Sequence, residues 1–166
     1  MRRAVHIVFA LGAALAASDS FAYCVRNALT DRPVHATVVP NRTPPPPKLF
    51  SESVAAGKEF CCNPKNADCN PDRVADEAWV AFEARVETST QPILCGQPDP
   101  KAPQNARATA PVRGFLRFEL NPRFDARRPP APDNPPFLVK ALTADNKVVA
   151  AYTCPPRQSA KLREVE

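Results

Sequence analysis

The chain has 166 residues, a net charge of +5, six cysteines and 21 prolines. This length suits one domain with a hydrophobic core of its own. The basic residues are scattered, with Arg127 and Arg128 as the only adjacent pair after residue 22, so the charge pattern argues against a nucleic-acid-binding protein. No segment approaches the ~20 apolar residues that a membrane-spanning helix needs.

Residues 1–22 have the pattern of a cleavable secretory signal peptide. Two arginines precede an apolar run over residues 4–17, and Ser20 and Ala22 supply the small residues expected before a cut at Tyr23. Three alternatives remain open, namely an uncleaved membrane anchor, a buried first helix and a lipoprotein signal that acylates the next cysteine. Cleavage would leave 144 residues with a net charge of +4. We therefore expect a secreted or periplasmic protein.

An even number of cysteines in an exported chain predicts a disulfide framework. Cys61 and Cys62 are adjacent, so in a strand their side chains point to opposite faces and must form two different bonds. We expect one of them to close the short loop to Cys69 and the other to reach a distant strand. A zinc site is the alternative, although no C-x-x-C pair is present. The full set is Cys24, Cys61, Cys62, Cys69, Cys95 and Cys154.

Alternation of apolar and polar residues predicts seven or eight short strands. The first two should pair as an opening hairpin, the next two should pair about Gly57, and the last two should form a hairpin through a turn at residues 144–146. A helix over residues 74–85 is an alternative to the strand there. The main expected strands are a run starting at Cys24 and residues 34–38, 48–54, 58–62, 79–86, 116–120, 137–143 and 147–154.

Proline-rich loops should connect these strands, because proline lacks an N–H group and has a fixed φ. Residues 44–47 are four consecutive prolines, and residues 98–111 and 122–136 are expected to be longer loops. Residues 157–166 are a polar tail that we expect to be disordered. The predicted fold class is all-β: a small disulfide-stapled β-sandwich, or partly open barrel, over residues 23–156.

The acidic stretch after Cys62 has the spacing of a calcium-binding loop at four positions. The departures are an arginine in place of the loop glycine and Trp79 in place of the final glutamate. A solvated acidic loop is the interpretation we prefer, and we expect no cofactor. The calcium candidates are Asp68, Asn70, Asp72 and Asp76.

A binding surface is the other candidate site. Trp79 lies on the polar face of its expected strand, where an exposed indole could stack on a sugar ring or anchor a protein contact. The alternative is that it packs under a loop. Asn66 and Asp68 belong to the loop that disulfides would pin. Catalysis has little support, because His35 is the only histidine after residue 22 and no G-x-S-x-G motif is present.

These patterns predict a binding or structural module of the cell envelope or extracellular space. Its ligand would be a protein or a glycan, and we expect a monomer without a membrane span. One alternative is an enzyme that acts on extracellular polymers with paired carboxylates or a bound metal. Another is a secreted inhibitor or effector that binds a protein through the loop from Cys61 to Asp72.

Overall fold

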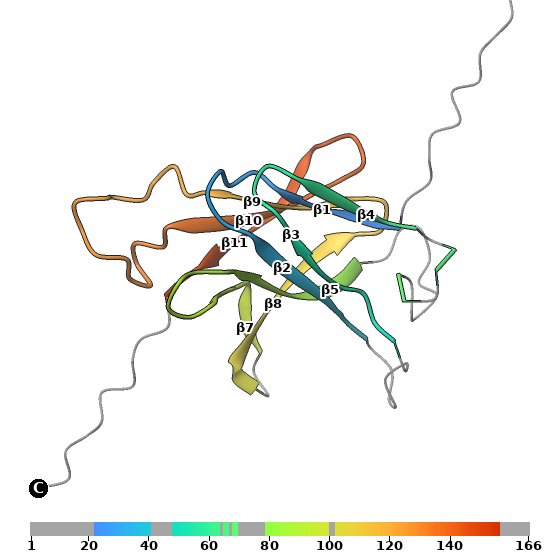
Figure 1. The fold of residues 1–166 in the computed structure, drawn as a ribbon, viewed down its shortest axis with the longest axis horizontal. Coiled ribbons are helices and arrows are strands. Elements are labelled where there is room, and N and C mark those ends of the chain that lie inside the picture. Colours follow the sequence, from blue (N-terminus) through green and yellow to red (C-terminus); the bar gives the residue numbers. More distant parts are fainter. Residues whose placement is uncertain are drawn as a thin grey trace, which may run out of the picture.

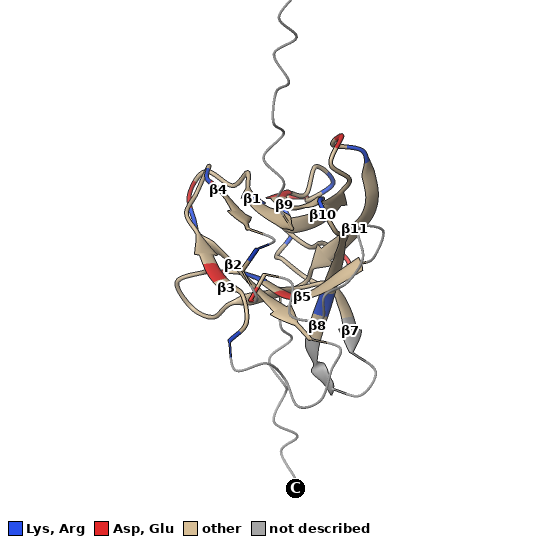
Figure 2. Ribbon diagram, turned by 90° about the vertical axis from the view of Figure 1, so that its right-hand side faces the viewer, with Lys and Arg blue, Asp and Glu red and all other residues tan. Residues whose placement is uncertain are grey.

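A computed structural model gives the fold as two β-sheets packed face to face, which Figures 1 and 2 show as two layers. No helix among the described residues is long and apolar enough to cross a membrane. The expected all-β sandwich stapled by disulfides is confirmed. The structure describes residues 22–40, 48–63, 65–66, 68–69, 79–99 and 102–156, with the backbone alone at 98–99 and 102–105.

The first sheet has five strands. Among the described residues of this sheet, one pairing is parallel, between the strands at residues 23–27 and 115–120, and the others are antiparallel. In spatial order the strands are β11 (Val148–Cys154), β10 (Phe137–Leu142), β9 (Phe115–Leu120), β1 (Tyr23–Asn27) and β4 (Glu59–Cys62).

The second sheet has six strands, all paired antiparallel. Five of them lie in the order β3 (Ser51–Val54), β2 (Val34–Val39), β5 (Trp79–Val86), β8 (Ala102–Pro111) and β7 (Gln97–Asp99). The sixth, β6 (Ile93–Cys95), pairs with the second half of β5.

The core forms where the inner faces of the two sheets meet. Alternation along β5 buries every second side chain, as Phe82 illustrates, and leaves the others on the outer face. The ring of Tyr23 packs edge to face against Phe50 and Phe82, at centroid distances of 5.1 and 4.9 Å. Burial raises the pKa of the Tyr23 hydroxyl, and the nearby carboxylate of Asp68 adds to the effect.

Asn27 ties the two sheets together on one side of the sandwich. Its side-chain nitrogen donates to the carbonyls of Arg32 and Val54, each at 2.9 Å, and its side-chain oxygen accepts from the amide of Leu29 at 3.0 Å. Asn27 is buried, so these bonds satisfy polar groups that would otherwise be costly to remove from water.

The opposite side of the sandwich is closed by contacts to β11. The amide of Gly96 donates to the carbonyl of Thr153 at 3.1 Å, and the Tyr152 hydroxyl lies 2.6 Å from the Thr109 hydroxyl. Gly96 has φ +130, and a Cβ there would lie 2.3 Å from the backbone of Arg107. Only glycine therefore fits this crossing.

Cys61 and Cys62 form two different disulfides, as the sequence predicts. Cys61 bonds to Cys24 across the pairing of β4 with β1, and Cys62 closes the short loop to Cys69. The third bond joins β6 to β11 and so links the second sheet to the first, between Cys95 and Cys154. The expectation that one neighbour closes the short loop and the other reaches a separate strand is confirmed.

The predictions of two of the three hairpins are wrong. β1 and β2 lie in different sheets, and so do β3 and β4, so the turns between them carry the chain from one layer to the other. A turn signal shows where the chain reverses, but it does not show whether the flanking strands pair. The final hairpin is confirmed, because β10 pairs with β11.

The expected loop over residues 98–111 is also wrong, because β8 occupies most of it. Its inner residues in the second half are Ala108 and Ala110, which are fully buried. Alanine is a weak apolar signal beside prolines, and the alternation was therefore missed. The strand over residues 79–86 is confirmed against the helical alternative, while residues 74–78 lie outside the described residues.

Candidate functional site

The outer face of the six-stranded sheet carries an indole, an imidazole, hydroxyl groups and charged side chains. We call it the β2–β5 face. Register places its residues in adjacent rows, because directly opposed residues of neighbouring strands share a face. Its members are His35, Thr37, Val39, Ser51, Ser53, Trp79, Ala81, Glu83, Arg85, Leu94, Arg107, Thr109 and Pro111.

Trp79 stands at one end of this face. It is 45% exposed, and its direct cross-strand partner on β8 is Pro111. The prediction that it shares a face with Glu83 and Arg85 is confirmed, because the residues between them alternate inward. An indole with so much exposed surface can offer both an apolar ring and an N–H donor to a ligand.

A polar cluster stands near the other end of the face. His35 Nε2 lies 3.1 Å from Thr37 Oγ1 and 3.1 Å from Ser51 Oγ, and the two hydroxyl oxygens are 2.9 Å apart. Each hydroxyl has one donor and two acceptor lone pairs, so the cluster keeps hydrogen-bonding capacity for a ligand. Sequence reasoning found His35 but not its neighbours. The alternation of His35 with Thr37 on one strand face was the available signal.

The charges around the cluster are largely balanced. Arg85, the cross-strand partner of His35, donates through Nε to a Glu87 carboxylate oxygen at 2.7 Å. Partial burial lowers the pKa of His35, and the positive charge of Arg85 lowers it further, against the opposing effects of Glu87 and Glu52. Burial and the charge of Arg85 both favour the neutral imidazole over the imidazolium.

A hollow of about 430 Å³ adjoins this end of the face. It lies between the turn before β2 and the turn after β5, and Glu87 belongs both to its lining and to the ion pair with Arg85. The other carboxylate in its lining, Asp31, is paired with Arg32. The hollow thus offers space beside the β2–β5 face without an excess of either charge. Its lining is Asp31, Arg32, Pro33, Glu87, Thr88 and Ser89.

The outer face of the five-stranded sheet is different in kind. Its charged side chains pair with one another, as Lys140 does with Glu119 at 2.5 Å and Arg26 does with Glu59. The guanidinium of Arg26 also lies over the Phe115 ring, 4.6 Å from its centroid. In Figure 2 the charged residues are spread over several strands of both sheets and do not gather into one patch.

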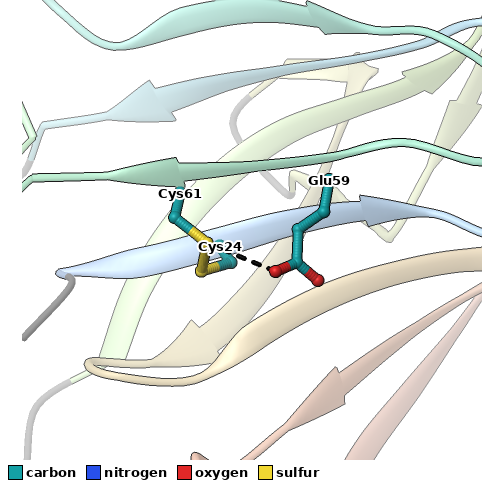
Figure 3. Close-up of side chains that lie close together, drawn as sticks. All are labelled: Cys24, Glu59 and Cys61. Atoms are coloured by element: carbon teal, nitrogen blue, oxygen red, sulfur yellow. Dashed lines mark hydrogen bonds between the residues drawn. A yellow bond between two sulfur atoms is a disulfide. The ribbon is translucent and has the colours of Figure 1, made fainter. Parts of the chain in front are cut away.

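Figure 3 shows the one group of metal-ligating residue types found close together among the described residues. It consists of Cys24, Cys61 and Glu59, but the two sulfur atoms are joined in a disulfide and offer no thiolate to a metal. The contact of 3.4 Å between Cys61 Sγ and a Glu59 oxygen, dashed in Figure 3, therefore has no thiol proton to share. This group has a structural role in pairing β1 with β4.

The loop closed by the Cys62–Cys69 disulfide begins next to Cys61 and contacts Phe50, the residue before Ser51 of the β2–β5 face. The backbone carbonyl of Asp68 accepts from the amide of Phe50 at 3.1 Å, and the Asp68 carboxylate lies 3.6 Å from Lys48 Nζ. The amide of Asn66 donates to the Asn63 carbonyl. No contact between Trp79 and this loop is found among the described residues. The other calcium candidates, Asn70, Asp72 and Asp76, lie outside the described residues.

Comparison with known proteins does not indicate what this surface binds. No protein-family model matches the chain, and neither a curated protein nor a solved structure matches it.

Proposed function

We propose that this chain is an extracytoplasmic binding module and that the β2–β5 face is its ligand-binding surface. The observation that carries the proposal is the exposure of Trp79 on the outer face of a sheet whose inner face is fully packed. An exposed indole offers a ligand both a large apolar ring surface to cover and an N–H donor, and this supports a binding role for Trp79.

Two further observations support the proposal. Three disulfides indicate an oxidising compartment, which agrees with the prediction that residues 1–22 are a signal peptide. The backbone pairing of six strands holds the strands of this face in place before a ligand arrives. A pre-organised surface loses little conformational entropy on binding.

Co-sedimentation tests the proposal with the exported protein and the insoluble envelope fraction of the cells that produce it. We expect the wild-type chain to sediment with the envelope and Trp79→Ala to remain in the supernatant. Leu120→Ala is the matched control, because Leu120 is 63% exposed but lies at the end of β9 in the other sheet.

The control should sediment like the wild-type chain. Equal sedimentation of the wild-type chain and Trp79→Ala, with both variants folded by circular dichroism, would show that the β2–β5 face is not the binding surface. Absence of sedimentation by the wild-type chain would count against the envelope as the source of the ligand.

A further inference from the structure

We propose that the ligand of the β2–β5 face is a neutral oligosaccharide that lies along β5, from Trp79 towards the hydroxyl cluster around His35. This inference rests on the proposed function and adds the chemical class of the ligand. It is carried by the spacing of the indole and the cluster, by the balance of charge between them, and by the scarcity of apolar anchors on the face.

The spacing suits an extended ligand. Trp79 and Arg85 are six residues apart on one strand, which corresponds to about 20 Å at the rise of a β-strand. His35 is the direct cross-strand partner of Arg85, whereas the two hydroxyl-bearing residues, Thr37 and Ser51, lie level with Glu83, about 13 Å along β5 from Trp79. A chain of several sugar rings can contact both groups at once, whereas a single small molecule cannot.

The chemistry at the two ends suits sugars. The apolar surface of a pyranose ring can stack on the Trp79 indole, and the indole N–H can donate to a ring hydroxyl. At the other end, Thr37 and Ser51 each carry a hydroxyl that both donates and accepts, as do the hydroxyls of a sugar. Between the two ends lie Ala81 and Val39, which are directly opposed and half-buried. Their short side chains do not project far from the sheet, so a ligand could pass over them.

The charges argue against an anionic ligand. The Arg85 guanidinium is already paired with Glu87, and partial burial and the charge of Arg85 lower the pKa of His35, which favours its uncharged ring. Glu83 and Arg107 are both exposed on this face and add one charge of each sign, so the face has no net positive charge to attract a phosphate, a sulfate or an acidic sugar. A ligand without charge fits this balance.

The apolar residues argue against a protein partner. Protein interfaces usually have several large anchor side chains at their centre. The exposed large apolar side chains of the described residues are Phe60, Trp79, Leu120, Val148 and Val149, and only Trp79 lies on the β2–β5 face. One aromatic platform beside hydroxyl groups is the arrangement that a glycan needs.

Calorimetric titration with defined sugars tests the inference. The probes are cellohexaose, xylohexaose, mannohexaose and acetylated chitohexaose, with a polygalacturonate oligomer as the acidic comparison. We expect at least one neutral hexasaccharide to bind and the acidic oligomer to bind more weakly. Because Trp79 is the only tryptophan, its fluorescence should change on binding.

Variants separate stacking from hydrogen bonding. Trp79→Ala should weaken binding about tenfold or more, which corresponds to about 1.4 kcal/mol, while Trp79→Phe should retain most of the affinity because it keeps an aromatic ring. The double variant Thr37→Val with Ser51→Ala should weaken binding about threefold to tenfold. Leu120→Ala should bind like the wild-type chain.

The inference is overturned if no neutral hexasaccharide binds, or if Trp79→Ala binds as well as the wild-type chain. Its failure is distinguishable from that of the proposed function. If the chain still sediments with the envelope through Trp79, and proteinase treatment of the envelope abolishes this, the binding surface stands and its ligand is a protein.

Discussion

Removal of the disulfide between Cys95 and Cys154 tests what holds the two sheets together. The bond closes a loop with a sequence separation of 59, and the chain-entropy relation gives a loss of about 4 kcal/mol for its removal. The double variant Cys95→Ala with Cys154→Ala should therefore have a Tm about 10 to 15 °C lower. Loss of this link also leaves only non-covalent contacts between β6 and β11.

The bond between Cys62 and Cys69 provides a matched control. Its sequence separation is only 7, so the same relation gives a loss of about 2 kcal/mol. All four cysteines are buried, so the cavities left by alanine should cost similar amounts and largely cancel in the comparison. Urea unfolding of both double variants under non-reducing conditions measures the difference.

The variant without the Cys62–Cys69 bond should thus be the more stable of the two. Equal losses, or a larger loss for the short loop, would refute the argument from loop length. Six free thiols in the native exported protein, with no loss of stability on reduction, would refute the whole disulfide framework.

Three other outcomes are expected. The exported chain should begin at Tyr23, and sequencing that finds Ala22 or an earlier residue retained would contradict that cut. Chelation with EGTA should leave Tm unchanged, because the Asp68 carboxylate already has a lysine partner at 3.6 Å; a calcium-dependent rise in Tm would favour the metal site. Gly96→Ala should lower the free energy of unfolding in urea by about 2 to 4 kcal/mol, because the new Cβ would lie 2.3 Å from the backbone of β8. Gly57→Ala is the control, because a Cβ there meets nothing within 4 Å and the loss should be only about 1 kcal/mol. Equal losses would contradict the clash at Gly96.

A cut before Tyr23 would have a structural consequence, because Ala22 takes part in the fold. Its amide donates to the carbonyl of Cys62 at 2.8 Å, and its carbonyl accepts from the amide of Arg113 at 2.7 Å. A chain that starts at Tyr23 would lose both of these hydrogen bonds next to the start of β1. Comparison of two recombinant chains, starting at Ala22 and at Tyr23, should therefore show the longer one to be more stable.

Local patterns predicted the strands whose two faces differ most in polarity. β5 was found because its apolar and polar residues alternate over eight positions, and the β10–β11 hairpin was found because its turn residues separate two apolar runs. β8 was missed because its buried positions are alanines. Alternation of a small side chain with polar residues gives little contrast in hydrophobicity.

Which strands pair with which was less accessible from sequence. The turn before β2 was located correctly, but it crosses between sheets, and the buried Asn27 that bonds to both layers is the feature that explains the crossing. The candidate site depends on the same long-range register. Ser51 reaches His35 only because β3 pairs with β2, and no local pattern of residues 34–39 contains that information.

His35 offers a test of the polar cluster that does not depend on any ligand. It is the only histidine after residue 22, so NMR can follow its ring without assignment of overlapping signals. Partial burial, and then the charge of Arg85, should hold its pKa below the ordinary 6.5, while Glu87 and Glu52 act in the opposite direction. A measured pKa of 6.5 or higher would contradict this balance.

The same shift has a consequence for stability. Because the pKa of His35 is lower in the folded state, the unfolded chain binds more protons when the pH lies between the folded value and about 6.5. Stability should therefore fall as the pH drops through this window, and the contribution of His35 should then stay constant below its folded pKa. Other groups also titrate near pH 5, so urea unfolding of His35→Gln at pH 7.5 and pH 5 is the control. The wild-type chain should lose more stability between these two pH values than the variant, and an equal or smaller loss would show that burial and Arg85 do not disfavour the imidazolium in the folded protein.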